Sequence, residues 1–190
     1  MMHRSFANQR SDYQFVAEQL KRLTKKVSIA KSFKVNSAIL PIVKEILISM
    51  SSVDYFKLHK LYYLIEYNYF KKHKQRLTNA YIVRQKDGPY CTDLHIQKLK
   101  KGLPDLQIRT REGSLFLALS PNMFDYYEHL NGDVGQVIQD VMSRYGKLSN
   151  EEIKTKVYLT EPMRNVLRME KHEHMNLYNV PVPFDLKKVH

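Results

Sequence analysis

The feature that most constrains the fold is a run of apolar residues at helical spacing between positions 134 and 145. Six apolar side chains fall at positions 0, 3, 4, 7, 8 and 11 of this run: Val134, Val137, Ile138, Val141, Met142 and Tyr145. This spacing places all six on one side of an α-helix, so that side must be buried against other parts of the chain. Gly146 follows and is predicted to end the helix as a C′ glycine.

The same period recurs along most of the chain. Ser37 is an N-cap type for a helix that runs to about residue 50, and Pro41 is tolerated in its first turn. Ser149 and Glu152 have the spacing of a capping box, which predicts the start of another helix. Further helices are predicted over residues 11–23, 54–72, 92–101, 121–130 and 160–172.

Two short stretches have strand character. Residues 81–83 form a β-type run that ends in a turn signal at Asp87, Gly88 and Pro89. Apolar residues alternate over 106–110 and again over 115–119, with Glu112 and Gly113 between them, which predicts a β-hairpin.

The predicted fold class is therefore mainly α (α+β): a compact helical domain with a small β element or hairpin and a basic, helical N-terminal extension. We expect residues 1–36 to form the extension, residues 37–176 the helical domain, and residues 177–190 an extended C-terminal tail.

The charge is unevenly distributed. The chain of 190 residues has 31 Lys and Arg against 19 Asp and Glu, a net charge of +12. Residues 1–102 hold 20 basic and 7 acidic residues, or +13, whereas residues 103–190 hold 11 and 12, or −1. This asymmetry favours an acidic or polyanionic partner at the N-terminal half, although lysines on solvated helix faces explain it equally well.

Composition also bounds the cellular setting. Cys91 is the one cysteine, so no internal disulfide forms and a reducing compartment fits best. The longest apolar run, residues 38–50, is too short and too polar to span a bilayer, and residues 1–6 contain no signal-peptide core. We expect a cytoplasmic protein without a membrane partner.

Catalytic and metal-binding patterns are sparse. Cys91 with His95 one helical turn later is the most enzyme-like arrangement, but a buried structural cysteine is the simpler interpretation. His172 and His174 point about 200° apart on a helix and chelate poorly there. The six glycines form no phosphate-binding loop. We therefore expect no enzyme activity, no metal and no cofactor.

The predicted helix over 54–72 is unusually rich in tyrosine. Its five tyrosines are Tyr55, Tyr62, Tyr63, Tyr67 and Tyr69, interleaved with lysines 57, 60, 71 and 72. Five tyrosines cannot all face one core stripe, so the set favours an interface with protein or nucleic acid, or with another copy of the chain.

Four further segments follow one another along the chain: residues 56–63 (FKLHKLYY), 81–90 (YIVRQKDGPY), 141–152 (VMSRYGKLSNEE) and 160–163 (TEPM). In this order they resemble the Panacea (SocA-like, phage-associated) antitoxin domain family. Residues 56–63 (FKLHKLYY) resemble its KLQKLLYY signature, and residues 81–90 resemble its aromatic strand leading into YGPV. Residues 141–152 resemble its hVxxxYGxLSAEEL stretch, and residues 160–163 its TxxEPW element. Asp87, Tyr90 and Met163 depart from these patterns. The resemblance assigns structural motif roles to Leu58, Leu61, Tyr62, Gly88, Pro89, Tyr145, Gly146, Glu161 and Pro162.

The resemblance implies a non-catalytic, bacterial protein-interaction module. Such a module neutralises a cognate toxin by direct binding or acts as an adaptor for its proteolysis. The candidate partner-binding residues are Lys57, Lys60, Tyr63, Tyr67, Arg84, Lys86 and Tyr90. The alternative is a phage- or operon-encoded regulator that binds nucleic acid through the basic N-terminal half. An enzyme that uses Cys91 and His95 is the third hypothesis.

Overall fold

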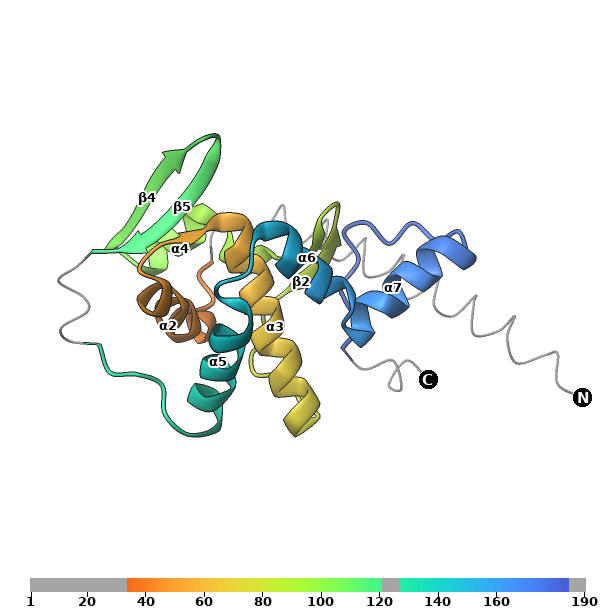
Figure 1. Cartoon of the computed structure of the whole chain (residues 1–190), viewed down its shortest axis with the longest axis horizontal. Helices are drawn as coiled ribbons and strands as arrows, with labels where there is room; N and C mark the ends of the chain where they lie inside the picture. The colour runs from red at the N-terminus through yellow and green to blue at the C-terminus, as the bar shows by residue number, and fades with distance from the viewer. Residues whose placement is uncertain (1–33, 121–126, 185–190) are drawn as a thin grey trace, which may run out of the picture.

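The computed structural model describes residues 34–120 and 127–184, which form a mainly helical domain with two small antiparallel sheets at its periphery (Figure 1). The elements, in order, are η1 (Ser37–Ile39), α2 (Leu40–Met50), β1 (Val53–Asp54), α3 (Tyr55–His73), β2 (Ile82–Gln85), β3 (Gly88–Cys91), η2 (Thr92–Leu94), α4 (Ile96–Gly102), β4 (Leu106–Arg111), β5 (Ser114–Leu119), α5 (Gly132–Tyr145), α6 (Asn150–Tyr158) and α7 (Glu161–His172). The mainly helical α+β class is confirmed. The helix predicted over 11–23 lies outside the described residues.

Helix α3 is the centre of the fold. The Asp54 side chain accepts a hydrogen bond from the Lys57 backbone N–H at 3.2 Å and so caps its first turn, and Lys74, in the left-handed conformation, ends it. Residues 58–66 are all buried, because β3, α5 and α6 contact different sides of this helix. A helix that is enclosed on every side needs no polar face over its middle turns.

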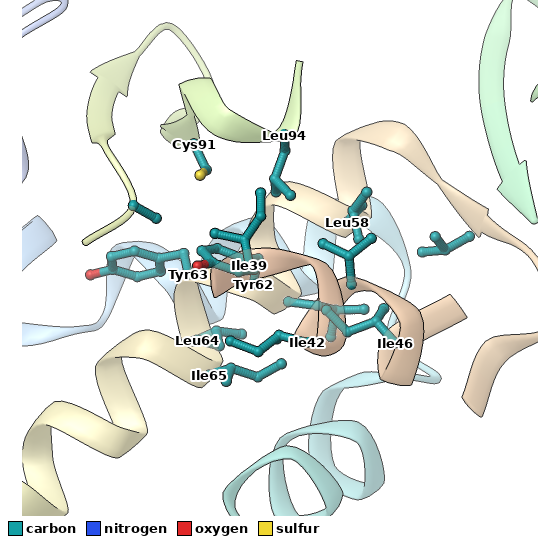
Figure 2. Packing of buried hydrophobic residues seen from close by; sticks show 14 of the residues in the cluster. Ile39, Ile42, Ile46, Leu58, Tyr62, Tyr63, Leu64, Ile65, Cys91 and Leu94 are labelled. Carbon is teal, nitrogen blue, oxygen red and sulfur yellow. The ribbon is translucent and has the colours of Figure 1, made fainter. Parts of the chain in front are cut away.

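The core lies between the first half of α3 and its neighbours (Figure 2). Ile39, Ile42 and Ile46 approach from η1 and α2, and Cys91 and Leu94 approach from the side of β3 and η2. Each fully buried aliphatic side chain of this kind contributes about 1.5–3 kcal/mol. The helix predicted from residue 37 to about residue 50 and the one predicted to start at Ser149 each bury a valine, Val43 and Val157.

The two sheets differ in their surroundings. Strands β2 and β3 form a hairpin that packs on α3. The other sheet has the order β1-β5-β4, so β4 is an edge strand, and the β4–β5 hairpin extends away from the helices at one end of the molecule (Figure 1). Its turn is built from Glu112 (φ 50°) and Gly113 (φ 76°), the two positive φ values that a two-residue type I′ turn requires. The hairpin predicted over 106–119 is confirmed.

The C-terminal elements follow the predicted signals. Ser149 and Glu152 form a capping box in which each side chain accepts from the other residue's backbone N–H. Helix α7 begins after Thr160, with Pro162 in its first turn. Residues 177–184 then return to β2, where Val180 and Val182 are buried.

Several helix boundaries were predicted wrongly. Asn36, not Ser37, caps the first helix, because its side chain accepts from Ala38 N and the helix opens with a 3₁₀ turn. Asp54 is the cap of α3 rather than part of its first turn, and with Val53 it pairs with β5. The helix expected over 92–101 is broken at His95, where the backbone is extended (ψ 134°) and α4 then begins.

Three further predictions need correction. Gly88 and Pro89 are strand residues in β3, and the turn lies at Lys86 and Asp87. Gly146 is right-handed (φ −60°), so left-handed geometry does not explain this glycine; a Cβ there would lie 2.6 Å from the Met142 carbonyl oxygen. Of the helix expected over 121–130, residues 121–126 lie outside the described residues and residues 127–130 are not helical.

Candidate partner-binding surface

A buried lysine joins α3 to the β2–β3 hairpin. Lys60 Nζ donates a hydrogen bond to the Pro89 carbonyl oxygen at 3.0 Å and lies 4.6 Å from the centre of the Phe56 ring. Only 4% of Lys60 is exposed, and this burial lowers the pKa of its ammonium group to about 7. Gly88 adopts φ +97°, which L side chains rarely adopt, and a Cβ there would lie 3.6 Å from the same amine.

His59, the residue before Lys60 on α3, makes the second contact with β3. Its Nδ1 accepts the Cys91 backbone N–H at 3.2 Å, and its ring stacks on Tyr90 with centroids 4.1 Å apart. Tyr55 packs edge-on against the same imidazole and donates to the Leu94 carbonyl at 3.1 Å. Burial lowers the pKa of His59, so the ring stays neutral and Nδ1 remains an acceptor.

A buried carboxylate fixes the loop that enters β2. Glu66 is fully buried and accepts hydrogen bonds from the Tyr62 hydroxyl (3.2 Å), the Arg76 Nε (2.8 Å) and the Thr78 hydroxyl. Arg76 also donates to the Ala80 carbonyl at 3.0 Å. Because every partner of this carboxylate comes from α3 or the loop before β2, the network holds the start of the hairpin against the helix.

Tyr63 connects α3 to the junction of α6 and α7. The Thr160 hydroxyl donates to the Val157 carbonyl at 2.7 Å, so the Tyr63 hydroxyl is the donor in its 2.7 Å contact with Thr160. The motif residues thus converge on α3. Those that are buried are Leu58, Leu61, Tyr62, Gly88, Pro89, Gly146 and Pro162, while Tyr145 is half-buried and Glu161 is exposed.

The structure separates the predicted partner-binding residues. Lys60 and Tyr63 lie inside the protein, so neither side chain is exposed at the surface of this structure. The sequence does not show that the middle turns of α3 are buried on all sides. Tyr90 is half-buried against His59, and Tyr67 stacks on Tyr63.

The remaining three do not form one patch either. Arg84 pairs with Glu170 of α7 at 3.1 Å, whereas Lys86 is exposed at the tip of the β2–β3 hairpin. Lys57 lines a hollow beside the other hairpin, together with Arg111. Of the predicted set, Lys57 thus lines a hollow in the protein surface.

One hollowed surface was not among the predictions from the sequence, and we call it the outer sheet face. It consists of Gln107, Arg109 and Arg111 on β4, opposite Ala118, Phe116 and Ser114 on β5. Two hollows of about 400 Å³ each lie along it and share Ser52 and Phe116. The alternation of the hairpin already contains the signal, since two arginines and two small residues lie among the positions that alternate with its aliphatic residues.

Cys91 and His95, the most enzyme-like pair in the sequence, lie in different environments. Cys91 is buried, which raises the pKa of its thiol to about 12, whereas His95 is exposed and caps α4. Within residues 34–120 and 127–184, no three His, Cys, Asp or Glu side chains are grouped so that they could hold a metal ion. The helices of the same residues include none that is long and apolar enough to cross a membrane.

The fold and its buried motifs define a mainly helical domain in which four sequence elements meet on one central helix. This chain belongs to the family described as "Antitoxin SocA-like, Panacea domain", whose model matches residues 58–162. The match includes both hairpins and confirms the resemblance seen in the motifs. No curated protein and no solved structure matches the chain. Family membership indicates a toxin–antitoxin-related role with a toxin or another protein as partner.

Proposed function

We propose that this protein is an antitoxin-like interaction module that neutralises a cognate toxin by direct contact, without catalysis of its own. The observation that carries this proposal is the family match over residues 58–162. Neutralisation then consists of steric occlusion: a surface of the domain covers the active site or substrate groove of the toxin. An adaptor would bind the toxin through the same contact, and the toxin would then be degraded by a protease instead of being occluded.

The arrangement of the motifs supports this proposal. Lys60, Glu66 and Tyr63 make their polar contacts inside the protein, so they fix the frame on which a binding surface is displayed. A frame held by buried, satisfied polar groups loses little conformational freedom on association, which favours binding. Exposed cations such as Lys86 and Arg109 would speed the encounter with an acidic partner.

The charge asymmetry favours a second candidate, a regulator that binds nucleic acid. Residues 1–102 carry a net charge of +13, and part of that charge lies outside the described residues. Binding of this kind releases counterions from the phosphate backbone, so its affinity falls steeply as salt rises.

One experiment separates the two candidates. The full chain is co-expressed with the product of each adjacent gene, growth is recorded, and the tagged protein is purified at about 50 mM and about 500 mM salt. Restored growth, with a stoichiometric protein partner retained at the higher salt, supports the antitoxin. Nucleic acid that is lost at the higher salt, with no rescue of growth, overturns the antitoxin proposal in favour of the regulator.

A further inference from the structure

The outer edges of the two hairpins have different surroundings. The edge of β2 is covered by the chain itself: Arg84 N–H donates to the Val180 carbonyl and Asn179 N–H to the Arg84 carbonyl, both at 2.8 Å. Val182 N–H donates to the Ile82 carbonyl at 3.0 Å. On β4, no segment among the described residues pairs with the outer edge. An uncovered edge strand is a template for another strand.

The register shows which backbone groups β4 offers. In a hairpin with a two-residue turn, the residues that flank the turn form a hydrogen-bonded pair, and bonded and non-bonded pairs then alternate. Arg111 and Ser114 flank the turn, so Arg109 bonds with Phe116 across the ladder. The backbone groups of Ile108 and Thr110 therefore face outward, where an added strand would meet them.

The side chains beside the β4 edge determine which residues an added strand would carry. Arg109 is exposed, and 77% of the Arg111 side chain is exposed, both on the outer sheet face. Of the acidic groups there, Asp54 is buried as the cap of α3, and Glu112 lies at the tip, 3.6 Å from Arg111. Opposite charges on neighbouring strands attract, and like charges repel. An added strand would therefore carry acidic side chains at alternate positions.

We propose that β4 is the docking edge of this protein, and that its occupant is an extended segment of the toxin with alternating acidic residues. The proposal rests on the proposed function and names the surface through which it acts. The acidic side chains of the toxin strand lie beside Arg109 and Arg111, and its other face lies beside Ile108 and Thr110.

Charge argues against the two occupants that the chain itself could supply. A second copy added antiparallel through β4 would bring Arg109 and Arg111 against the same arginines of its partner. Residues 1–33 carry seven basic and two acidic side chains, so they are repelled by the same arginines. The acidic toxin segment is the occupant that gains from these charges.

The test uses a toxin that the full wild-type chain neutralises in the growth assay, and measures the Kd of that toxin for the wild type and four variants. Thr110→Pro removes an outward N–H without breaking the β4–β5 ladder, and Thr110→Val is its matched control because it keeps that N–H. Arg109→Glu with Arg111→Glu reverses the charge, and Lys100→Glu with Lys101→Glu is its control at exposed positions on α4.

We expect Thr110→Pro to weaken toxin binding about tenfold or more relative to Thr110→Val, which isolates the backbone N–H from the side chain. The arginine reversal should weaken binding about tenfold or more relative to wild type, with the lysine reversal within about twofold of wild type. Hydrogen exchange on the wild-type complex tests the same edge without any variant: the Ile108 and Thr110 amides should exchange at least about tenfold more slowly when toxin is bound.

Each other result overturns the proposal. If all variants bind alike and the Ile108 and Thr110 amides are unchanged in the complex, the toxin docks elsewhere while the antitoxin function stands. If these amides are already slow in the free full chain, another segment or another copy covers the edge, and sedimentation distinguishes the two. If the wild-type chain neutralises no toxin, the proposed function fails, and the docking edge fails with it.

Discussion

The β2–β3 and β4–β5 hairpins have similar ladders but opposite environments. The first is held on one side by Lys60 and His59 of α3 and covered on its edge by residues 179–182. The second contributes one face to the core through Leu117 and leaves its outer sheet face and the β4 edge open among the described residues. The difference separates a hairpin that is held within the frame from one whose edge is open among the described residues.

This contrast also explains why the motifs mark so little of the surface. The GPY segment of β3 and the tyrosine-rich segment of α3 lie against each other in the interior. Motifs that fix a frame identify the family, whereas the exposed side chains of β4 lie outside every motif. Four changes test the contrast, beginning with the largest expected effect.

Glu66→Ala should be the most damaging. It leaves the Tyr62 and Thr78 hydroxyls and the Arg76 guanidinium without their buried acceptor, and we expect a loss of about 3–5 kcal/mol in unfolding free energy. Urea denaturation measures it, with the exposed Glu151→Ala as a control within about 0.5 kcal/mol of wild type. A loss as small as that of the control would mean that this network does not hold the first hairpin.

Removing the cover of β2 should cost less. Val180→Ala with Val182→Ala deletes buried methyl groups and should lower the unfolding free energy by about 2–3 kcal/mol. The Arg84 amide, which donates to Val180, should then exchange faster with solvent. Leu115→Ala on the open hairpin, where 37% of the leucine is exposed, is the comparison and should cost about 1 kcal/mol or less. Equal losses would remove the contrast between the hairpins.

The pH dependence of stability reports on the buried amine. The pKa of Lys60 is about 7 in the folded protein and about 10.5 unfolded, so between these values the unfolded state binds more protons and stability rises with pH. From pH 7 to 8.5 the gain should be about 1–2 kcal/mol, because one pKa unit corresponds to about 1.4 kcal/mol. Below pH 7 the amine is protonated in both the folded and the unfolded state, so stability no longer changes with pH through this group.

Lys60→Met should abolish this rise, and Lys57→Met, at a half-buried position on the same helix, should keep it. Urea denaturation at several pH values between 7 and 8.5 measures both. If Lys60→Met shows the same slope as the wild type, the amine is not the group that titrates.

Charge reversal on the open hairpin should have the smallest effect on folding. Arg109→Glu with Arg111→Glu alters exposed side chains, so the unfolding free energy should change by no more than about 0.5 kcal/mol. Thermal denaturation checks this, and a large loss of stability would show that these arginines belong to the frame.

The sequence predicted the elements whose signals are local. The capping box at Ser149, the turn at Glu112 and Gly113 between the two alternating runs, and the apolar stripe from Val134 all led to the observed structure. The predicted boundaries of helices and strands were wrong where tertiary contacts compete with the local preference of the residues. Val53 and Asp54 became a strand because β5 offers them a partner, and Gly88 and Pro89 became a strand because α3 holds them.

By itself, the sequence determined the helical class, the positions of most helices and, through its motifs, the family, because periodicity, caps and motif order are properties of neighbouring residues. Only the tertiary structure decided which side chains reach the surface. It buried Lys60 and Tyr63 and exposed Arg109, because burial depends on segments far apart in the chain that meet on α3. For the same reason only the tertiary structure shows that one hairpin edge is covered and the other open.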